Sequence, residues 1–253
     1  MSIEKPVTSR HDFLGCPIDS LSFEEVVSEV TARITSGSPT SLIHFLNVAK
    51  IVKAQRDDRL REALWEGDFV VADGKPLLCF GRGLKIAIPT RVNGTDLMEK
   101  LIEVSDKRGF SIYLFGAEQN VVEKCVEKIK QKYPNIRIAG YRNGYFCDDE
   151  INGIICDINE SSSDILFIGL PTPKKEFFAY DNRTKLKVPI VQGVGGSFDV
   201  LAGSVNRAPK WMQNYGLEWL YRILQEPRRL FWRYLSTNIK FLWIYFKQIL
   251  FNL

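Results

Sequence analysis

Short apolar runs alternate with amphipathic stretches along most of the chain. Segments such as 22–35 and 121–132 repeat apolar residues at helical spacing, and Ser22 with Glu25 forms a capping box at the start of the first. Strands alternating with helices predict an α/β fold, a Rossmann-like and mainly parallel sheet with flanking helices. The runs with the length of buried strands are 41–46, 68–72, 111–115, 136–139, 164–168 and 188–191.

After Gly203 the pattern changes to Trp and Tyr interleaved with Arg and Lys, with one break at Pro227. We therefore predict an α/β core over residues 1–205 and an appendage of two or three amphipathic helices over 206–253. Its final stretch, 239–253, is apolar apart from Lys240 and Lys247, which share one helix face. This stretch is too short to cross a bilayer. It could lie in the membrane interface or pack on the core or a partner subunit, and composition favours neither.

Composition indicates a soluble globular protein. Of 253 residues, 45% are apolar and 25% charged, and the length suits one large domain. Five cysteines without a C-x-x-C pair and only two histidines argue against a zinc site or a disulfide framework, and favour a reducing cytosolic location. The polar start, with an early acid, does not resemble a signal peptide, and no run of about 20 apolar residues predicts a transmembrane helix.

The positive charge is concentrated at the C-terminal end. Residues 206–253 hold eight Lys or Arg and two acids, a net charge of +6, which leaves −2 for residues 1–205 of a chain with +4. This asymmetry implies that the C-terminal part meets an anionic partner, such as membrane lipid, a phosphorylated substrate or nucleic acid.

Ligands of parallel α/β sheets bind beyond the carboxyl ends of the strands, so candidate chemistry is sought there. Asp73 directly follows the apolar run 68–72. Partial burial would raise its pKa and make it a useful general base. Alternatively, Asp73 only caps the next helix, and the residues alone favour this simpler interpretation.

Two further strand-end loops suit phosphate groups. Gln192 and Gly193 open a glycine-rich stretch that ends at Asp199, where backbone N–H groups could approach a phosphate. It departs from the dinucleotide fingerprint, and no ribose-binding acid occurs at the required distance, so a nucleotide-phosphate or nucleoside site and a simple tight turn are the two alternatives. In the second loop, Arg91 precedes a turn in which Thr95 or Asp96 could cap a helix over 97–107. A guanidinium there suits a diphosphate, a surface salt bridge being the alternative.

The C-terminal arginines form either a solvated helix face or an anion-binding surface, and the interleaved aromatic residues favour the second. No D-x-D, H-E-x-x-H, P-loop or G-x-S-x-G motif is present, so neither metal nor acyl-enzyme chemistry has support. The C-terminal arginines that form the candidate anion-binding surface are Arg222, Arg228, Arg229 and Arg233.

Several stretches together resemble the WecG/TagA/CpsF family of bacterial glycosyltransferases. The resemblance spans roughly residues 10–235 and is most specific in its longest block, G-V-G-G-S-F-D-V-L-A-G at 193–203. The other matching blocks are A-D-G at 72–74, R-V-N-G-T-D-L at 91–97, G-Y-R-N-G-Y-F at 140–146, G-L-P-T-P-K at 169–174, R-A-P-K-W at 207–211, G-L-E-W-L-Y-R at 216–222 and Q-E-P-R-R at 225–229.

The resemblance implies an inverting, metal-independent and cofactor-free transferase in cell-surface polysaccharide biosynthesis. It would move an N-acetylmannosamine-like or related hexose from a UDP-sugar donor to a polyprenyl-diphosphate-linked saccharide acceptor. The enzyme would sit as a peripheral protein on the anionic inner face of the cell membrane, and would not bind nucleic acid. Whether the protein forms a homo-oligomer stays open. The competing classes are a non-catalytic nucleotide-sugar or nucleic-acid binding module and a Rossmann oxidoreductase.

The resemblance also implies roles for individual residues. The position of Asp73 matches the proposed general base, and Asn47 would lie near the acceptor or the base. The remaining positions would bind substrate: Arg91 near a diphosphate, Tyr145 and Asp199 near the nucleotide, Gln192 and Gly193 in the glycine-rich loop, and Arg222, Arg229 and Arg233 over the phosphates. Phe45, Lys175 and Trp232 depart from the family pattern, which often has threonine, glutamine and arginine there. By the resemblance, the first two lie where the substrate sugars bind, so the identities of the donor and acceptor sugars stay open.

Overall fold

Six parallel strands form the central sheet of the computed structural model, in the order β4-β3-β8-β7-β5-β6. The structure describes residues 9–251, without the side chains of Asn214, Arg229 and Phe251. The predicted parallel sheet is confirmed, with strand ends displaced by up to three residues. The strands are β3 (Ser41–Leu46), β4 (Phe69–Ala72), β5 (Ser111–Gly116), β6 (Arg137–Arg142), β7 (Ile165–Gly169) and β8 (Ile190–Gly193).

Helices cover both faces of the sheet because successive strand residues point to opposite sides. Ile165 and Phe167 of β7 pack with α1, α5 and α6, whereas Leu166 and Ile168 pack with α7 and α8. The predicted capping box of Ser22 and Glu25 starts α1. The helices of the core are α1 (Phe23–Thr35), α2 (Val48–Ala54), α3 (Asp58–Trp65), α4 (Lys75–Gly83), α5 (Gly94–Arg108), α6 (Gln119–Lys132), η1 (Asp148–Glu150), α7 (Ile151–Glu160), α8 (Lys174–Asp181) and α9 (Ser197–Leu201).

An antiparallel hairpin, β1 (Arg10–Phe13) and β2 (Cys16–Asp19), precedes the sheet and was not predicted from the sequence. Buried Asp19 joins the hairpin to the core. Its carboxylate pairs with Arg10 at 2.7 Å and accepts a hydrogen bond from the backbone N–H of Val70 at 2.7 Å. The strands are too short for a clear period-2 pattern, which explains why the sequence did not indicate them.

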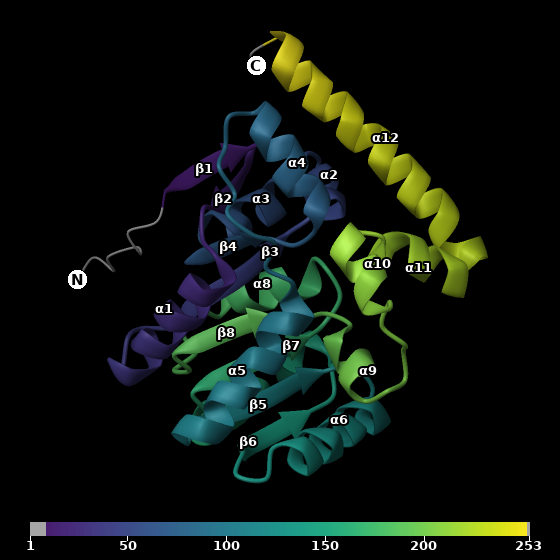
Figure 1. The fold of residues 1–253 in the computed structure, drawn as a ribbon. Helices are drawn as coiled ribbons and strands as arrows, with labels where there is room; N and C mark the ends of the chain where they lie inside the picture. The colour runs from purple at the N-terminus through teal and green to yellow at the C-terminus, as the bar shows by residue number, and fades with distance from the viewer. Residues whose placement is uncertain (1–8, 252–253) are drawn as a thin grey trace.

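Three helices come after the core, where the sequence predicted two or three: α10 (Lys210–Tyr215), α11 (Glu218–Gln225) and α12 (Pro227–Phe251). Figure 1 shows α12 running along α4 and α2, with α10 and α11 on the side toward which the arrowheads of β5, β6 and β8 point. Residues 239–251 of the apolar stretch expected over 239–253 belong to a single helix of 25 residues, and residues 252–253 lie outside the described part of the chain. None of the helices within residues 9–251 has both the length and the apolar character needed to cross a bilayer.

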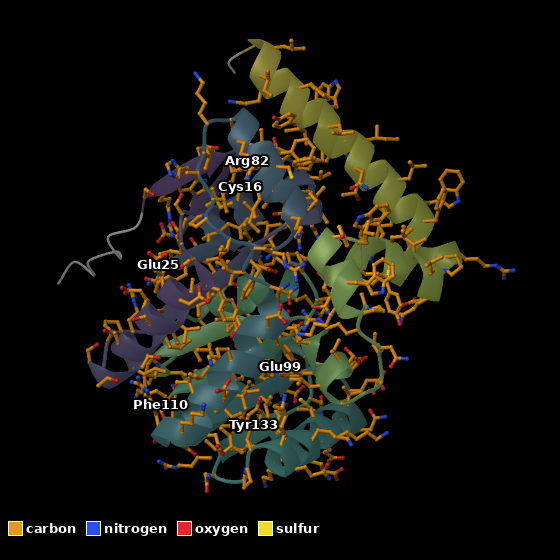
Figure 2. All side chains as sticks on the ribbon, in the orientation of Figure 1. Cys16, Glu25, Arg82, Glu99, Phe110 and Tyr133 are labelled. Carbon is orange, nitrogen blue, oxygen red and sulfur yellow. The ribbon has the colours of Figure 1, made fainter. Side chains whose placement is uncertain are left out.

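One side of α12 packs on the core and the other is exposed. Phe241 and Tyr245 are buried against Phe80 of α4, with ring centroids 5.0 and 4.6 Å from it. Figure 2 shows further side chains projecting from α12 on the side turned away from the core. The exposed apolar face of α12 consists of Trp232, Leu235, Ile239, Leu242, Trp243, Phe246, Ile249 and Leu250.

Candidate active site

The carboxyl ends of β3, β4, β7 and β8 open into a cleft of about 710 Å³, which we call the main cleft. Its other wall comes from α11 and α12. A side cleft of about 250 Å³ adjoins it between α2, α4 and α11. The two clefts share a wall, formed by the residues that line both of them: Asn47, Ala49, Asp73, Asn93, Arg222 and Tyr234.

Asp73 lies on this shared wall, directly after β4. Helix α4 has Gly74 as its N-cap and no side-chain capping bond, so the interpretation of Asp73 as a helix cap is wrong. Instead, one carboxylate oxygen of Asp73 accepts a hydrogen bond from the side-chain amide of Asn93 at 3.1 Å. Burial raises the pKa of Asp73, and the positive charge of Arg91 opposes this increase. The result is a carboxylate with raised basicity that faces two clefts.

Two asparagines at helix starts complete this wall. Asn47 caps α2 by accepting from the backbone N–H of Lys50 at 2.9 Å. Asn93 caps α5 through Thr95 N–H at 3.0 Å, so the prediction that Thr95 or Asp96 is the cap was wrong. The side-chain oxygen of Asn93 faces the helix and accepts the capping hydrogen bond. Its side-chain nitrogen therefore points away from the helix and donates the hydrogen bond to Asp73. Asn93 was not singled out from the sequence, although asparagine before a helix start is a recognisable cap signal.

Arg91 lines the side cleft and takes part in a charge network that joins α11 to the core. Its guanidinium contacts Glu218 at 2.6 Å and Asp96 at 3.6 Å. Arg207 also contacts Asp96, at 2.6 Å, and Glu218, at 3.7 Å. Arg91 is therefore held by two carboxylates, and its predicted contact with a diphosphate stays a prediction.

The C-terminal arginines differ in which of the two clefts they line. Arg222 lines both clefts, and its positive charge only partly opposes the increase that burial causes in the pKa of Asp73. Arg233 lines the main cleft, whereas its neighbour Trp232 is 71% exposed on the outer side of α12. Arg229 belongs to α12, but its side chain lies outside the described residues.

The glycine-rich loop lies on the floor of the main cleft, and only part of its predicted set is there. Gly193 lines the cleft. Gln192 is fully buried below it and donates a hydrogen bond to the carbonyl oxygen of Gly94 at 2.9 Å, so it supports the start of α5. Asp199 of α9 and Tyr145, which is 71% exposed after β6, lie outside both clefts. Their contact with a nucleotide stays a prediction.

A buried cluster of charges beside Asp73 was not predicted from the sequence. Lys50, Lys175 and Glu176 converge below the main cleft, which the two lysines line. In the sequence, Lys175 stands out only as a departure from the family pattern. No sequence periodicity brings residue 50 next to residue 175, because the contact depends on the neighbouring positions of β3, β8 and β7 in the sheet.

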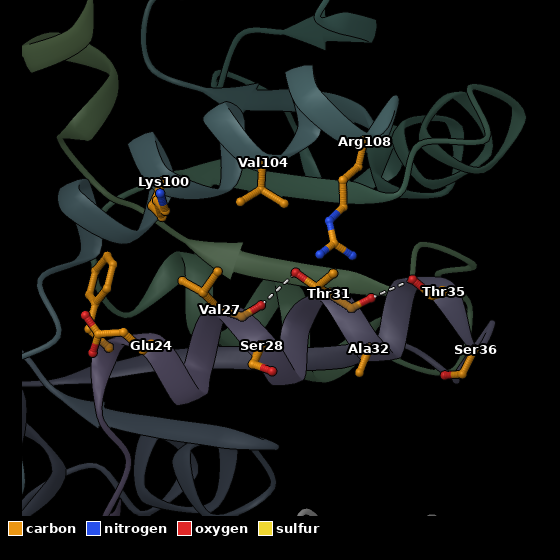
Figure 3. A pocket seen from close by; sticks show the side chains of 11 residues that line it. Glu24, Val27, Ser28, Thr31, Ala32, Thr35, Ser36, Lys100, Val104 and Arg108 are labelled. Atoms are coloured by element: carbon orange, nitrogen blue, oxygen red, sulfur yellow. Dashed lines mark hydrogen bonds between the residues drawn. The ribbon is translucent and has the colours of Figure 1, made fainter.

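Another hollow, of about 850 Å³, lies between α1 and α5, away from the strand ends. Figure 3 shows Lys100, Val104 and Arg108 facing Val27 and Thr31 across it. The hydroxyl of Thr31 donates to the carbonyl oxygen of Val27 at 2.8 Å and is thus used within α1. The reactive groups instead converge at the strand ends. Within residues 9–251, no cluster of three or more His, Cys, Asp or Glu side chains could hold a metal ion.

A parallel α/β sheet with a carboxylate on the wall between two strand-end clefts places the protein in the doubly wound α/β class, whose ligands bind at the carboxyl ends of the strands. The family model of the "Glycosyl transferase WecG/TagA/CpsF family" matches residues 11–253. The chain belongs to this family and is a glycosyltransferase.

Two Bacillus relatives carry the same name, N-acetylglucosaminyldiphosphoundecaprenol N-acetyl-beta-D-mannosaminyltransferase. The protein of Bacillus spizizenii (strain W23) is 31% identical over 232 residues, covering 89% of this chain and 88% of the relative. The protein of Bacillus subtilis (strain 168) is 33% identical over 189 residues, covering 75% of this chain and 73% of the relative.

Proposed function

We propose that the protein transfers an N-acetylmannosamine-like or related hexose from a UDP-sugar to a polyprenyl-diphosphate-linked saccharide, during synthesis of a cell-surface polysaccharide. The observation that carries this proposal is the position of Asp73 on the wall shared by two clefts. A transferase must bring two substrates to one base, and each cleft can hold one of them. The names of the Bacillus relatives support N-acetylmannosamine as the sugar that is transferred and a diphosphoundecaprenol-linked N-acetylglucosamine as the acceptor.

In the proposed reaction, Asp73 takes the proton of the acceptor hydroxyl. The hydroxyl oxygen forms a bond to the anomeric carbon of the donor, and the bond from that carbon to the phosphate oxygen breaks. The electron pair of the broken bond leaves with UDP, and attack from the face opposite UDP inverts the anomeric centre. Asn93 holds the Asp73 carboxylate in position through its 3.1 Å hydrogen bond.

Positive side chains in the main cleft would stabilise the charge that develops on the departing UDP. Arg222 and Arg233 approach the main cleft from α11 and α12, opposite the glycine-rich loop. A guanidinium can bind phosphate oxygens through two parallel hydrogen bonds. Release of UDP from UDP-N-acetylmannosamine in the presence of polyprenyl-diphosphate-linked N-acetylglucosamine tests the function, and absence of release from a panel of UDP-sugars and acceptors would contradict it.

A chelator is expected to leave this activity unchanged. The chain carries no D-x-D motif, and arginines are proposed to neutralise the diphosphate where other glycosyltransferases use a divalent ion. The measurement is UDP release before and after treatment with EDTA, and again after addition of Mg²⁺ or Mn²⁺. Loss of activity that either ion restores would contradict the metal-independent mechanism.

We further propose that the exposed apolar face of α12 binds the membrane that carries the acceptor. Lys240 and Lys247 are both exposed beside this face, where they can reach lipid headgroups. Each basic residue close to an anionic leaflet adds about 1 kcal/mol to binding. The residues of α12 that face the core, Phe241 and Tyr245, would remain in place.

Replacing Trp232, Trp243 and Leu250 together by serine is expected to release the protein from anionic vesicles. These side chains are 71, 66 and 72% exposed, so the fold should stay intact, whereas removing residues 236–253 would uncover the core beneath Phe241. Co-sedimentation with vesicles across a salt series measures the loss, with Tyr141→Ser, an exposed aromatic of β6, as the control. Undiminished binding by the triple variant would mean that this face does not bind the membrane.

A further inference from the structure

Helix α11 brings Arg222 to both clefts, yet none of its eight residues is buried. A helix of this length is not stable by itself in water, so its place over the clefts depends on contacts with its neighbours. It packs on α10 and α12. Ion pairs from its first residue, Glu218, join it to the loops that precede α5 and α10. Glu218 therefore stands at the connection between α11 and the rest of the protein.

The carboxylate of Glu218 lies between two guanidinium groups. Its Oε2 is 2.6 Å from Nη1 of Arg91, and its Oε1 is 3.7 Å from Nε of Arg207. Asp96 of α5 contacts the same two arginines, at 3.6 and 2.6 Å. The two positive and two negative charges cancel, so the network is neutral. Because its arginines are only 13 and 21% exposed, water screens these pairs less than pairs on the open surface.

Arg91 is held firmly by the core. The next residue, Val92, is fully buried and donates its backbone N–H to the carbonyl oxygen of Ala72, at the end of β4, at 2.9 Å. Asp73 follows Ala72 directly, so the backbone that holds Arg91 also adjoins the proposed base. A carboxylate that pairs with Arg91 is therefore held at a defined place relative to Asp73.

Glu218 and Arg222 are one turn apart on α11, and residues four apart lie on the same face of a helix. Both side chains line the side cleft. Burial is the main cause of the raised pKa of Asp73, the charge of Glu218 adds to this increase, and the charge of Arg222 opposes it. Both groups are thus within electrostatic reach of the proposed base. Holding Glu218 against the core therefore fixes the face of α11 that presents the exposed Arg222.

Building on the proposed function, we propose that Glu218 is a positioning residue, whose ion pair with Arg91 holds α11 so that Arg222 reaches the departing UDP. Glu218 transfers no proton and acts through Arg222. Without this pair α11 would keep its contact with α12, where the ring centroids of Trp219 and Tyr234 are 6.3 Å apart, but would lose its tie to the core. The competing role, in which Glu218 occupies Arg91 and keeps a substrate phosphate away, predicts the opposite change in activity.

Steady-state UDP release by Glu218→Gln tests this role, because glutamine keeps the size of the side chain and removes its charge. We expect kcat to fall by about tenfold, as for the loss of one charged contact. KM for the lipid-linked acceptor should stay the same, since Arg222 is proposed to act on the charge that develops on UDP. Glu218→Asp, which keeps the charge, should recover most of kcat. A rise in kcat of Glu218→Gln, or a lower KM for the UDP-sugar, would show that Glu218 blocks Arg91 and would overturn the proposal.

Glu103 of α5 provides the matched control. Its carboxylate also joins two cations, Lys100 at 3.0 Å and Lys107 at 2.5 Å, but all three residues belong to one helix and lie outside both clefts. Glu103→Gln removes the same charge and should leave kcat unchanged. Equal losses in Glu103→Gln and Glu218→Gln would assign the effect to net charge and overturn the positioning role.

A double-mutant cycle asks whether Glu218 acts through Arg222. When Arg222→Ala is already present, adding Glu218→Gln should cause no further loss of kcat, because the group that Glu218 positions is gone. A further tenfold loss in this background would mean that Glu218 acts independently of Arg222, for example through the stability of the protein. That result would overturn the proposal.

Hydrogen exchange of the α11 backbone separates this inference from the proposed function, since it needs no substrate. Glu218→Gln should speed the exchange of the amides at 221–225 by about tenfold, whereas exchange in the buried strand β7 should stay the same. If the wild type released no UDP from any substrate pair, the proposed transfer would be wrong, but this measurement would still decide whether Glu218 holds α11. Unchanged exchange in α11 would overturn the inference.

Discussion

Asp73→Asn is expected to lower the rate of sugar transfer by roughly 10²–10⁴-fold, because an amide cannot accept the proton of the acceptor hydroxyl. Asparagine has nearly the same size, and Asp73 does not cap α4, so the fold and substrate binding should be retained. UDP release under single-turnover conditions measures the effect. A variant with near-wild-type turnover would exclude Asp73 as the base.

The pH dependence of the wild type provides an independent check. Transfer requires the ionised form of Asp73, so the rate should fall as pH decreases through the pKa of this group. An ordinary aspartate has a pKa of about 3.9. Since burial raises the pKa of Asp73, the fall in rate should occur at a higher pH than for an ordinary aspartate. The same fall should be missing from the residual activity of Asp73→Asn. If the residual rate of Asp73→Asn falls at low pH in the same way as the wild-type rate, a titrating group other than Asp73 causes the fall.

The second large effect is expected for Arg222→Ala, which should lower kcat/KM by about 10²-fold. Arg222 lines both clefts, and its loss would leave the developing charge on the departing UDP without one of its guanidinium partners. Vesicle binding should change far less than turnover, because Arg222 belongs to α11 and lies outside the exposed apolar face of α12.

Arg228→Ala is the matched control for this experiment. Arg228 is exposed in the first turn of α12 and lies outside both clefts, so its removal takes away the same charge without touching the proposed site. Both variants are measured for UDP release and for vesicle co-sedimentation at the same salt concentration. Equal losses of turnover would show that the general positive charge of this region matters, rather than a contact of Arg222.

The sheet was predictable from the sequence because each buried strand is a short apolar run ended by a turn residue. Asp73 was also recognisable as a group at a strand end, although the residues alone favoured a helix cap. The cap assignment failed because Gly74 takes a backbone conformation with φ of 120° and itself starts α4. Features set by the local order of residues, such as the strands and the position of Asp73 after β4, were therefore predicted well.

Contacts between segments that are distant in the sequence could not be predicted from the sequence. The pair of Arg91 and Glu218 joins residues 127 positions apart, and nothing in either local pattern marks the partner. The Lys50–Glu176–Lys175 cluster depends on the order of strands in the sheet, which alternating strands and helices do not specify. The packing of Phe241 on α4 likewise reflects the tertiary fold, because the apolar residues of α12 occupy two sides of one helix and only one side meets the core.

The polar groups at the strand ends follow different strands: Asn47 lies after β3, Asp73 after β4, Thr172 and Lys175 of α8 after β7, and Gly193 ends β8. The proposed base, Asp73, and the cleft residues after β7 are therefore separate parts of the chain on one sheet. A protein engineer could diversify residues 171–175 to seek new sugar substrates while leaving the loop of Asp73 untouched. The same separation gives evolution a way to change the polymer without rebuilding the catalytic step.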